Sequence, residues 1–327
     1  DGMAAVPPPL VPGHEFGGRL DNGEFVVVNP MVGCGRCPAC AAGRTNVCAQ
    51  RKVIGYTRAG AYAERIAVPL RNLVPAPGLS AAQAALVEPI ANGVHGWHRA
   101  GRPGGRVAII GAGAIGMCLL HVLVRRGLAD ITVVDPVPSR LEAAKAAGAS
   151  AVAPRLSGSF EAVFDAAGTE GTRTDAVSCT GLGGTVALLG LHDDRLPASA
   201  APLIVGDRTL AGCFGYTEPE FVEAVQLASE IDAPWAQDVP AGQAEAAIEA
   251  LIAGTAPAGR IKTIIHFAAW AAAAARSSTP AIARAASSGS DAPGQRRPRA
   301  AMLQGGDAPA RRCSRAGCGR DQQPAAR

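Results

Sequence analysis

Long hydrophobic runs are missing from the 327-residue sequence, which has no stretch of about 18 uninterrupted apolar residues, the length that a membrane-spanning helix needs. The first residues also lack the basic segment followed by an apolar stretch that is typical of a secretory signal peptide. We therefore predict no membrane span and expect a cytoplasmic protein.

Aromatic residues are scarce, at 4 % of the chain, whereas hydrophobic residues make up 48 %. The core must therefore be built mainly from Ala, Val, Leu and Ile. Residues 268–327 hold a single aromatic residue, Trp270, and are dominated by Ala, Arg, Gly, Pro and Ser without apolar periodicity. Such a composition buries too little apolar surface to fold, so we expect a disordered low-complexity tail.

Positive charge is concentrated in that tail. Residues 268–327 contain ten Arg, no Lys, three Asp and no Glu, whereas the whole chain has a formal net charge of +4, so the rest carries a small negative net charge. Arg clusters attract nucleic-acid phosphates nonspecifically, which makes a nucleic-acid binder one hypothesis. The tail has no aromatic residue beyond Trp270 to stack on bases, and the cysteine spacing does not match a DNA-reading finger. We therefore expect no specific nucleic-acid partner.

The nine cysteines are an odd number without a secretion signal, which argues against a disulfide framework. Cys34, Cys37, Cys40 and Cys48 are separated by two, two and seven residues. Four thiolates at this spacing fit tetrahedral Zn²⁺ and fill its coordination shell, leaving no position for water or substrate. We therefore predict that the segment 33–48 is a lobe held together by a structural zinc ion.

Short segments bounded by Pro and Gly dominate residues 1–91, where strands are predicted at 24–30 and 61–69. The pattern changes near residue 80, because the segment 80–100 has helical composition and begins with Ser80 as a possible N-cap. The first part of the chain is thus predicted to be a β-rich region that ends in a helix.

An alternation of apolar strands and amphipathic helices begins at Arg106, with Ser139 as the expected N-cap of the second helix. Uniformly apolar strands in this arrangement predict a parallel sheet covered on both faces. Residues 217–254 are predicted to form two helices joined by a Pro-containing link, and 259–267 a closing strand. The fold class is therefore α/β, with a doubly wound Rossmann sheet.

A G-x-G-x-x-G motif formed by Gly111, Gly113 and Gly116 directly follows the first of these strands and opens a helix. The glycines permit a tight turn, backbone approach to a pyrophosphate and close helix–strand packing, and the helix N-terminus attracts phosphate. About 20 residues further on, at the end of the next strand, Asp135 is placed to accept the ribose hydroxyls, which favours NAD. Arg140 is the residue that could instead take a 2′-phosphate, although a place along the adenosine or in solvent is favoured. Further cofactor contacts are expected from Ala114, Ile115, Gly190 and Leu191.

Three histidines, His95, His98 and His121, are interpreted as structural. His95 and His98 lie on the predicted helix 80–100 and are expected to pack there, and His121 lies on an apolar helix. His192 follows a strand whose end is expected to face the nicotinamide, but the backbone of Gly190 and Leu191 is a better candidate for contact with the ring.

Four motifs occur in a characteristic order: "GHEFGG" at 13–18, the four-Cys lobe, "VEPIANGVHG" at 87–96, and the dinucleotide unit. This order resembles the zinc-dependent medium-chain dehydrogenase/reductase superfamily, which has the alcohol dehydrogenase fold. The nearest branch is that of the polyol, butanediol and threonine dehydrogenases. The domains that the resemblance implies are a truncated GroES-like β-barrel catalytic domain from 1–91 and 215–267, and a Rossmann NAD-binding domain at 92–214.

The resemblance also implies a second, catalytic zinc ion. His14 of "GHE" matches the imidazole ligand of that family, and Glu15 matches either a second ligand or an acid behind the ligands. Glu88 of "VEP" resembles the acid that binds zinc directly or through water, and such sites keep one position for water or substrate. The implied reaction is hydride transfer between NAD and a secondary alcohol or polyol, with the metal polarising the alcohol oxygen. A homodimer or homotetramer is implied as well.

One feature of the family is missing from this sequence. A catalytic Cys and a relay Ser or Thr stand some tens of residues before "GHE" in the family, whereas His14 is only thirteen residues from Asp1. A thiolate is a preferred zinc ligand, so a site made of His14, Glu15 and Glu88 is expected to bind zinc less tightly. A catalytically impaired relative or fragment that binds NAD and one structural zinc ion is therefore the alternative hypothesis.

Overall fold

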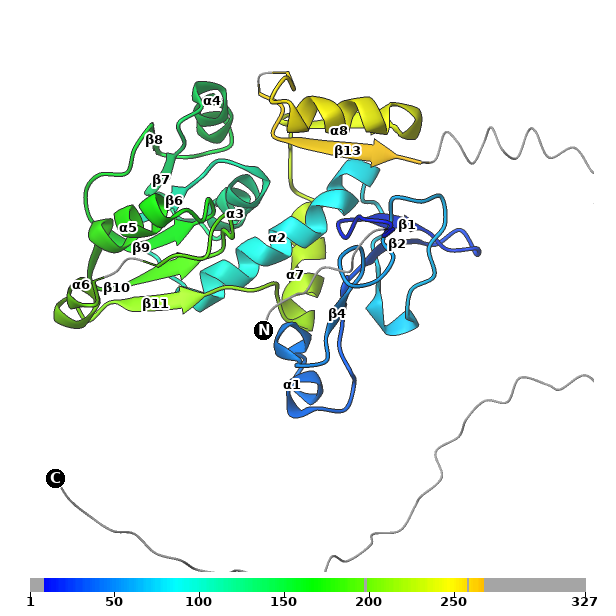
Figure 1. Cartoon of the computed structure of the whole chain (residues 1–327), viewed down its shortest axis with the longest axis horizontal. Helices are drawn as coiled ribbons and strands as arrows, with labels where there is room; N and C mark the ends of the chain where they lie inside the picture. Colours follow the sequence, from blue (N-terminus) through cyan, green and yellow to red (C-terminus); the bar gives the residue numbers. More distant parts are fainter. Residues whose placement is uncertain (1–8, 197–198, 258, 268–327) are drawn as a thin grey trace, which may run out of the picture. The chain divides into compact units, whose positions relative to one another are not determined.

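Six parallel strands form the largest sheet of the computed structural model, which describes residues 9–196, 199–257 and 259–267 (Figure 1). The tail predicted at 268–327 lies outside the described residues. The strand order is β11-β10-β9-β6-β7-β8. It reverses between β6 and β9, so the sheet has the topological switch point at which doubly wound sheets bind ligands. The strands are β6 (Val107–Ile110), β7 (Ile131–Val134), β8 (Ala151–Ala153), β9 (Phe160–Asp165), β10 (Thr180–Leu188) and β11 (Thr209–Gly212).

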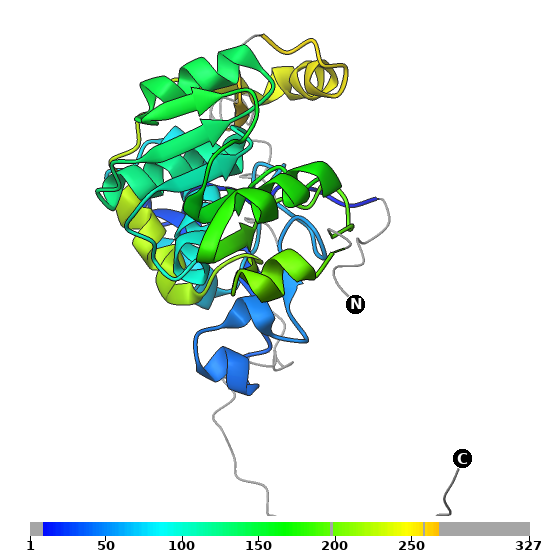
Figure 2. The ribbon, with the colours of Figure 1, turned by 90° about the vertical axis from the view of Figure 1, so that its left-hand side faces the viewer.

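Helices cover both faces of this sheet (Figure 2). Val107 and Ile109 of β6 belong to one hydrophobic cluster, and the alternate residues Ala108 and Ile110 belong to another. Successive side chains of a strand point to opposite faces, so β6 is buried on both sides, as the uniformly apolar sequence predicts. The doubly wound α/β fold is thus confirmed. The helices that accompany these strands are α3 (Ala114–Arg125), α4 (Pro138–Ala146), α5 (Glu170–Cys179) and the short α6 (Ala201–Val205).

The predicted N-cap of α4 is wrong. The cap residue is Val137, and Ser139 lies within the first turn of the helix. Pro138 takes the first helical position, where a missing N–H costs nothing and the fixed φ suits the helix. The carboxylate of Asp135 accepts a hydrogen bond from the Val137 amide at 2.9 Å. Asp135 therefore also fixes the backbone at the start of α4.

The β-rich part of the chain contains an antiparallel sheet in the order β1-β2-β5 and a separate β3–β4 pair. The strand predicted at 24–30 is present as β2, but the strand predicted at 61–69 is wrong. The amides of Ala61 and Tyr62 donate to the carbonyls of Gly13 and Pro12, so this segment follows a loop instead of a sheet edge. The elements here are β1 (Gly17–Arg19), β2 (Phe25–Val28), β3 (Met31–Val32), α1 (Pro38–Ala41), η1 (Thr45–Val47), β4 (Lys52–Val53), η2 (Leu70–Asn72) and β5 (Leu73–Pro75).

The long helix α2 (Ala81–Arg99) connects the short strands with the parallel sheet. Ser80 caps it as predicted, and Gln83 completes a capping box. The helix contacts β1 and β2 as well as β10, and it packs along α3 and α7 (Glu218–Ala228). An added Cβ at Gly93 would lie 2.9 Å from the Leu119 Cα, so the absence of a side chain at Gly93 lets α2 and α3 approach closely.

After α7 the chain forms a separate pair of parallel strands. The closing strand was predicted and is present as β13 (Lys262–His266), but its parallel partner β12 (Ala236–Pro240) lies in what the sequence indicated to be a link between helices. η3 (Ala241–Gln243) and α8 (Ala244–Ile252) separate these two strands. None of the helices in the described part of the chain has the length and apolarity needed to span a bilayer.

Candidate metal centres and cofactor site

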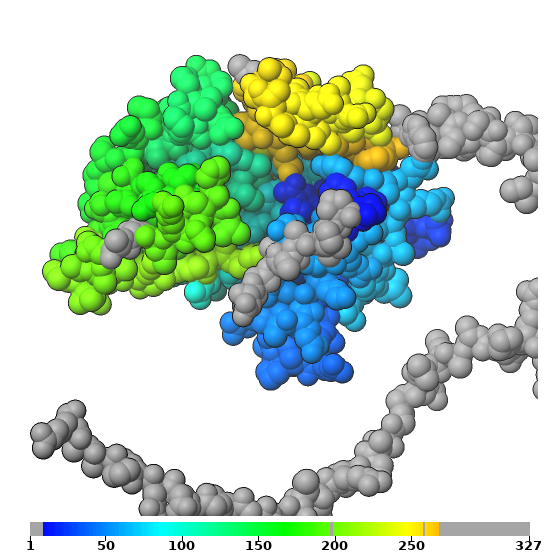
Figure 3. Space-filling model, viewed as in Figure 1, coloured from blue at the N-terminus to red at the C-terminus, as the bar shows by residue number. Residues whose placement is uncertain are grey.

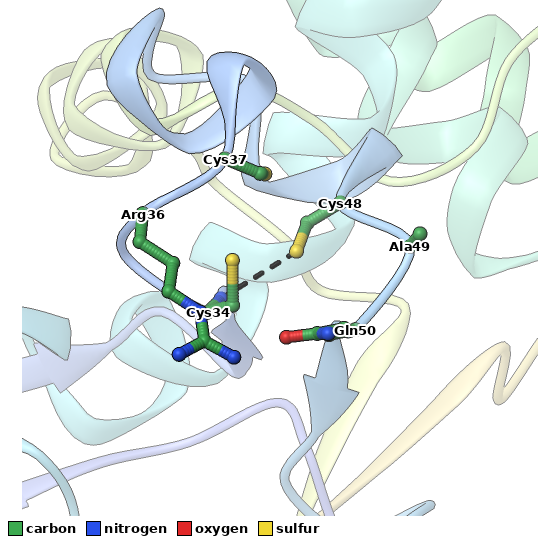
Figure 4. Close-up of a pocket in the computed structure, with 6 residues that line it drawn as sticks. All are labelled: Cys34, Arg36, Cys37, Cys48, Ala49 and Gln50. Carbon is green, nitrogen blue, oxygen red and sulfur yellow. Dashed lines mark hydrogen bonds between the residues drawn. The ribbon is translucent and has the colours of Figure 1, made fainter. Parts of the chain in front are cut away.

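The four cysteines of the lobe come together as their spacing predicts. The sulfur atoms of Cys34, Cys37, Cys40 and Cys48 all lie within 4.8 Å of one another. Those of Cys34, Cys37 and Cys48 point into a common space (Figure 4). Four sulfur atoms at such separations are compatible with the tetrahedral shell of Zn²⁺, which leaves no open position.

The electrostatics of these thiols favour a bound cation. A hydrogen bond from the Arg36 backbone lowers the pKa of Cys34 to about 6, so this sulfur is a thiolate at neutral pH. The Gly35 backbone acts in the same direction on Cys40, but burial and the neighbouring cysteines outweigh it and raise the pKa of Cys40 to about 11. A cation between the four sulfur atoms would stabilise the thiolate form of each cysteine, Cys40 included, so the residues fit a zinc ion.

The lobe is attached to a distant part of the chain. The Asn46 side chain donates to the carbonyl of Phe214 at 3.0 Å, and the Glu218 amide donates to the carbonyl of Gly43 at 3.0 Å. The Arg51 guanidinium lies 4.6 Å from the centre of the Phe214 ring. These contacts fix the lobe against the N-terminal end of α7, which is the behaviour expected of a structural metal centre.

A second cluster is formed by His14, Glu15 and Glu88, whose candidate ligand atoms lie within 4.8 Å of one another. Glu88 comes from α2, and the other two precede β1. Gly13 has φ of 100°, and a Cβ at this position would lie 2.6 Å from the Tyr62 ring, so the "GHE" segment requires glycine here. The three residues that the sequence singled out for a catalytic zinc ion thus lie together.

Glu88 is the buried member of this cluster, at 7 % exposure. Its two carboxylate oxygens accept hydrogen bonds from Asn92 at 3.0 Å and from the Tyr216 hydroxyl at 3.1 Å. Burial and, next, the negative charge of Glu15 raise the pKa of Glu88 to about 8. A divalent cation would stabilise the ionised form of Glu88, which burial and the charge of Glu15 disfavour, so this cluster also fits a metal ion.

Lys262 of β13 completes the surroundings and was missed by the sequence analysis. Its ammonium group forms an ion pair with the Glu15 carboxylate, although the two residues are 247 positions apart in the chain. In Figure 3 the dark blue atoms of the first described residues lie against the orange atoms of β13. The only indication in the sequence was the position of Lys262 in the strand "KTIIH", where a charged side chain adjoins apolar residues. Among the described residues, the cluster itself includes no cysteine.

The glycine-rich turn has the geometry of a phosphate-binding loop. Gly111 has φ of 96°, and a Cβ at Gly116 would lie 1.8 Å from the Gly111 carbonyl oxygen, so both positions require glycine. Gly113 is the N-cap of α3, and a Cβ there would meet no atom within 4 Å. The first amides of α3, from Ala114 and Ile115, thus have no capping side chain, and the space beside Gly113 is open, which suits a pyrophosphate.

Asp135 lies directly after β7 with 4 % exposure. Its carboxylate accepts a hydrogen bond from the Ala112 amide of the glycine-rich turn at 2.9 Å, and Arg140 lies 3.5 Å from the same oxygen. The carboxylate has lone pairs left for ribose hydroxyls. Arg140 is therefore oriented toward Asp135.

Gly190 and Leu191 follow β10 at the carboxyl edge of the sheet, where the sequence places the nicotinamide. The Gly190 amide donates to the carbonyl of Asp165 at 2.8 Å, and the Leu191 side chain is 81 % exposed. His192 is exposed beside them.

The other histidines have internal partners. His95 and His98 each hydrogen-bond one oxygen of Glu220, at 2.9 and 2.7 Å, and His121 lies 3.0 Å from the Leu227 carbonyl oxygen. These contacts join α2 and α3 to α7, in line with the structural interpretation of the three residues.

Comparisons with known proteins agree with this geometry. The family model described as "Zinc-binding dehydrogenase" matches residues 114–230, and that described as "Alcohol dehydrogenase GroES-like domain" matches residues 1–78. L-galactonate-5-dehydrogenase of Escherichia coli strain K12 is 32 % identical over 68 % of this chain and 72 % of its own length. D-altritol 5-dehydrogenase of Agrobacterium fabrum is 31 % identical over 62 % of this chain and 66 % of its own length.

Among solved structures, galactitol-1-phosphate dehydrogenase from Escherichia coli superposes with a TM-score of 0.70 and 27 % identity, covering 78 % of this chain and 84 % of that one. The chain therefore belongs to the zinc-binding dehydrogenases of the medium-chain alcohol dehydrogenase superfamily, a family of oxidoreductases. Zinc and a nicotinamide cofactor are the groups that this membership implies, and the two clusters and the glycine-rich turn fit them.

Proposed function

We propose that the protein is an NAD-dependent zinc dehydrogenase of secondary alcohols, with polyols or sugar acids as the substrate class. The observation that carries the proposal is the convergence of His14, Glu15 and Glu88 in one cluster. The relatives named above support the substrate class, because two of the names specify oxidation at carbon 5, an internal carbon of a polyhydroxylated chain.

The residues of the chain have distinct parts in this reaction. His14, Glu15 and Glu88 would hold the catalytic ion, while Tyr216 and Asn92 orient Glu88. When bound, the zinc ion would supply a Lewis acid that lowers the pKa of the alcohol oxygen, and the nicotinamide would supply the hydride acceptor. Helix α2 carries Glu88 and packs along α3, which begins at the glycine-rich turn. The packing of these two helices therefore fixes the position of the metal cluster relative to the glycine-rich turn.

The preference for NAD over NADP follows from Asp135. A buried carboxylate at the ribose repels a 2′-phosphate, and the nearby positive charge of Arg140 is directed at that carboxylate. We expect kcat/KM to be at least about tenfold higher with NAD than with NADP, as one unfavourable charge contact of roughly 1.4 kcal/mol implies. Steady-state assays with both cofactors measure this ratio, and an equal or reversed ratio contradicts the NAD assignment.

Zinc analysis tests the metal assignments. We expect close to two zinc ions per chain in the purified protein and close to one in the His14→Ala variant. The matched control is Cys37→Ser, which should lose the other ion and keep the one held by His14. One ion in the wild type, unaffected by His14→Ala, would mean that only the structural site binds.

An NADH absorbance assay over a panel of hexitols and aldonates separates the proposal from its alternative. Turnover of any secondary alcohol, abolished by His14→Ala, supports the dehydrogenase. NADH binding without turnover identifies the catalytically impaired relative, a hypothesis kept because the described part of the cluster includes no thiolate.

A further inference from the structure

Arg173 is the only buried arginine among the described residues, at 4 % exposure. It lies in α5, and its guanidinium donates to the loop that follows β10. One terminal nitrogen contacts the Asp193 carboxylate at 2.9 Å and the carbonyl of Arg195. The other contacts the carbonyls of Asp193 at 2.7 Å and Gly190 at 3.3 Å. A single side chain therefore holds several groups of the segment 190–195.

The segment 190–195 follows the carboxyl end of β10, at the edge of the sheet where the proposed cofactor would place its nicotinamide. Asp135 at the end of β7 marks the adenosine side, and a dinucleotide crosses the switch point between β6 and β9. The other end of the proposed cofactor would therefore lie over the carboxyl ends of β9 and β10, where Gly190 and Leu191 are located.

The contact between this segment and the end of β9 leaves no free space. A Cβ added at Gly190 would lie 2.4 Å from the Gly168 nitrogen, and one added at Gly168 would lie 2.2 Å from the Gly190 carbonyl carbon. The Asp193 amide also donates to the Gly168 carbonyl at 3.0 Å. The start of the segment, at Gly190, is thus fixed by backbone packing. Its later part, from Asp193 to Arg195, is fixed by hydrogen bonds from Arg173.

Asp193 links the same segment to the start of α5. One of its oxygens accepts a hydrogen bond from the Glu170 amide at 2.9 Å, in the first turn of the helix, while the other contacts Arg173. The hydrogen bond from the Glu170 amide is the main cause of the lowered pKa of Asp193, and the positive charge of Arg173 also contributes. Helix and loop therefore stabilise each other through one ion pair.

We propose that Arg173 is a positioning residue for the nicotinamide end of the cofactor. It keeps the segment 190–195 in the conformation in which the backbone of Gly190 and Leu191 meets the ring. The inference rests on the proposed NAD binding. Among the described residues, Arg173 makes no hydrogen bond to the glycine-rich turn or to Asp135, so the adenosine end is expected to bind independently of it.

Comparing NADH with ADP-ribose tests this inference, because ADP-ribose lacks the nicotinamide ring. Isothermal titration calorimetry should show that Arg173→Gln weakens NADH binding by about tenfold or more, the loss expected when hydrogen bonds from a charged donor are removed. The affinity for ADP-ribose should change by less than about twofold. Equal weakening of both ligands, or no weakening of either, overturns the proposal.

The matched control is Arg208→Gln. Arg208 also donates to backbone carbonyls of the parallel-sheet region, those of Thr180 and Pro202, but it lies beyond α6 and away from the segment 190–195. Its substitution should leave the ratio of NADH to ADP-ribose affinity unchanged. If Arg173→Gln does not fold, Asp193→Asn decides the question, since loss of the same ion pair should lower that ratio and an unchanged ratio overturns the proposal.

The wild type separates this inference from the proposed function. Failure of the wild-type protein to bind NADH and ADP-ribose contradicts the nicotinamide site as a whole. Normal binding of both ligands by the wild type and by Arg173→Gln contradicts the role of Arg173 alone.

Discussion

Lys262 is the positive charge that the chain itself supplies to the candidate catalytic cluster. Its side chain is 11 % exposed and pairs with Glu15, so the cluster of two carboxylates is partly neutralised before any metal binds. Glu15 is also one of the three candidate metal ligands, so Lys262 and a metal ion would share its negative charge. Lys262 therefore stabilises the metal-free protein and competes with the metal.

Replacing this lysine should separate the two effects. We expect Lys262→Met to lower the free energy of unfolding of the zinc-free protein by ~1–3 kcal/mol, because Glu15 loses its partner while Glu88 stays close. Saturating zinc should then raise the melting temperature of the variant more than that of the wild type. Thermal unfolding with and without zinc measures both, with the exposed Lys52→Met as control. An equal zinc-induced shift in both proteins contradicts this account.

Glu220 makes stability depend on acid pH. Hydrogen bonds from His95, the Thr217 amide and His98 outweigh the effect of burial and lower the pKa of Glu220 to about 2. Since the folded-state pKa is below that of an unfolded Glu, about 4.3, the carboxylate stabilises the fold above that pH. The contribution is lost as pH falls from about 4.3 toward 2, by at most about 1.4 kcal/mol per pH unit.

The Glu220→Gln variant should therefore be less stable than the wild type above pH 5, with a difference that shrinks as the pH falls below about 4. Denaturant unfolding between pH 3 and 7 measures the difference. Glu218→Gln, an exposed residue of the same helix, is the control and should show no such convergence. A pH-independent difference for Glu220→Gln contradicts the assignment.

At the scale of elements, the contact between α2 and α3 depends on one glycine. A Cβ at Gly93 would lie 2.9 Å from the Cα and 3.2 Å from the nitrogen of Leu119, and backbone atoms cannot move aside as a side chain does. The two helices would have to separate, and with them Glu88 and the start of the cofactor loop.

Gly93→Ala should accordingly destabilise the protein by ~1–3 kcal/mol in spite of the better helix propensity of Ala. Gly171→Ala is a matched control, because Gly171 is also helical and a Cβ there would have only the Thr169 hydroxyl within reach, at 3.9 Å. That substitution should leave the melting temperature unchanged or raise it slightly. Equal destabilisation of both variants would rule out the proposed contact.

The elements that the sequence predicted correctly are those with a local pattern. The strands of the parallel sheet are uniformly apolar, and Ser80 with Gln83 forms a capping box within four residues. The polar strand β12 was missed because its pairing with β13 is not visible in its own sequence. The wrong strand at 61–69 has a strand-like composition but hydrogen-bonds to a loop.

The candidate site follows the same rule. The four cysteines of the lobe, the glycine-rich turn and Asp135 could be predicted because each motif is short and continuous. His14 and Glu88 were found only through the resemblance of the motifs around them. Lys262 and Arg173 could not be found, since their partners are remote in sequence or belong to a loop that carries no motif.

For the whole molecule, exposed apolar side chains beside the edge of the parallel sheet support association of two copies. Leu182, Ile204 and Val205 are 81, 76 and 85 % exposed. The Gly183 amide donates to the carbonyl of Gly206 at 2.8 Å, which brings these residues side by side next to the edge strand β11. An apolar patch of this kind on a sheet edge is typical of an interface between subunits.

We expect the wild type to be a dimer or a larger oligomer and Val205→Asp to shift it toward the monomer. Size-exclusion chromatography with light scattering measures the mass. Leu70→Asp is the control, because Leu70 is 83 % exposed in η2, outside this patch, and its replacement should leave the mass unchanged. A monomeric wild type contradicts the prediction.

The distances along the chain that separate the parts of the two metal clusters imply an order of metal uptake during synthesis. Cys34 and Cys48 are 14 residues apart, so the lobe can bind its ion once a short segment has left the ribosome. Glu88 and Glu15 acquire their partners Tyr216 and Lys262 only when 128 and 247 further residues have been made. The lobe can thus bind its ion before the surroundings of the candidate catalytic centre are complete.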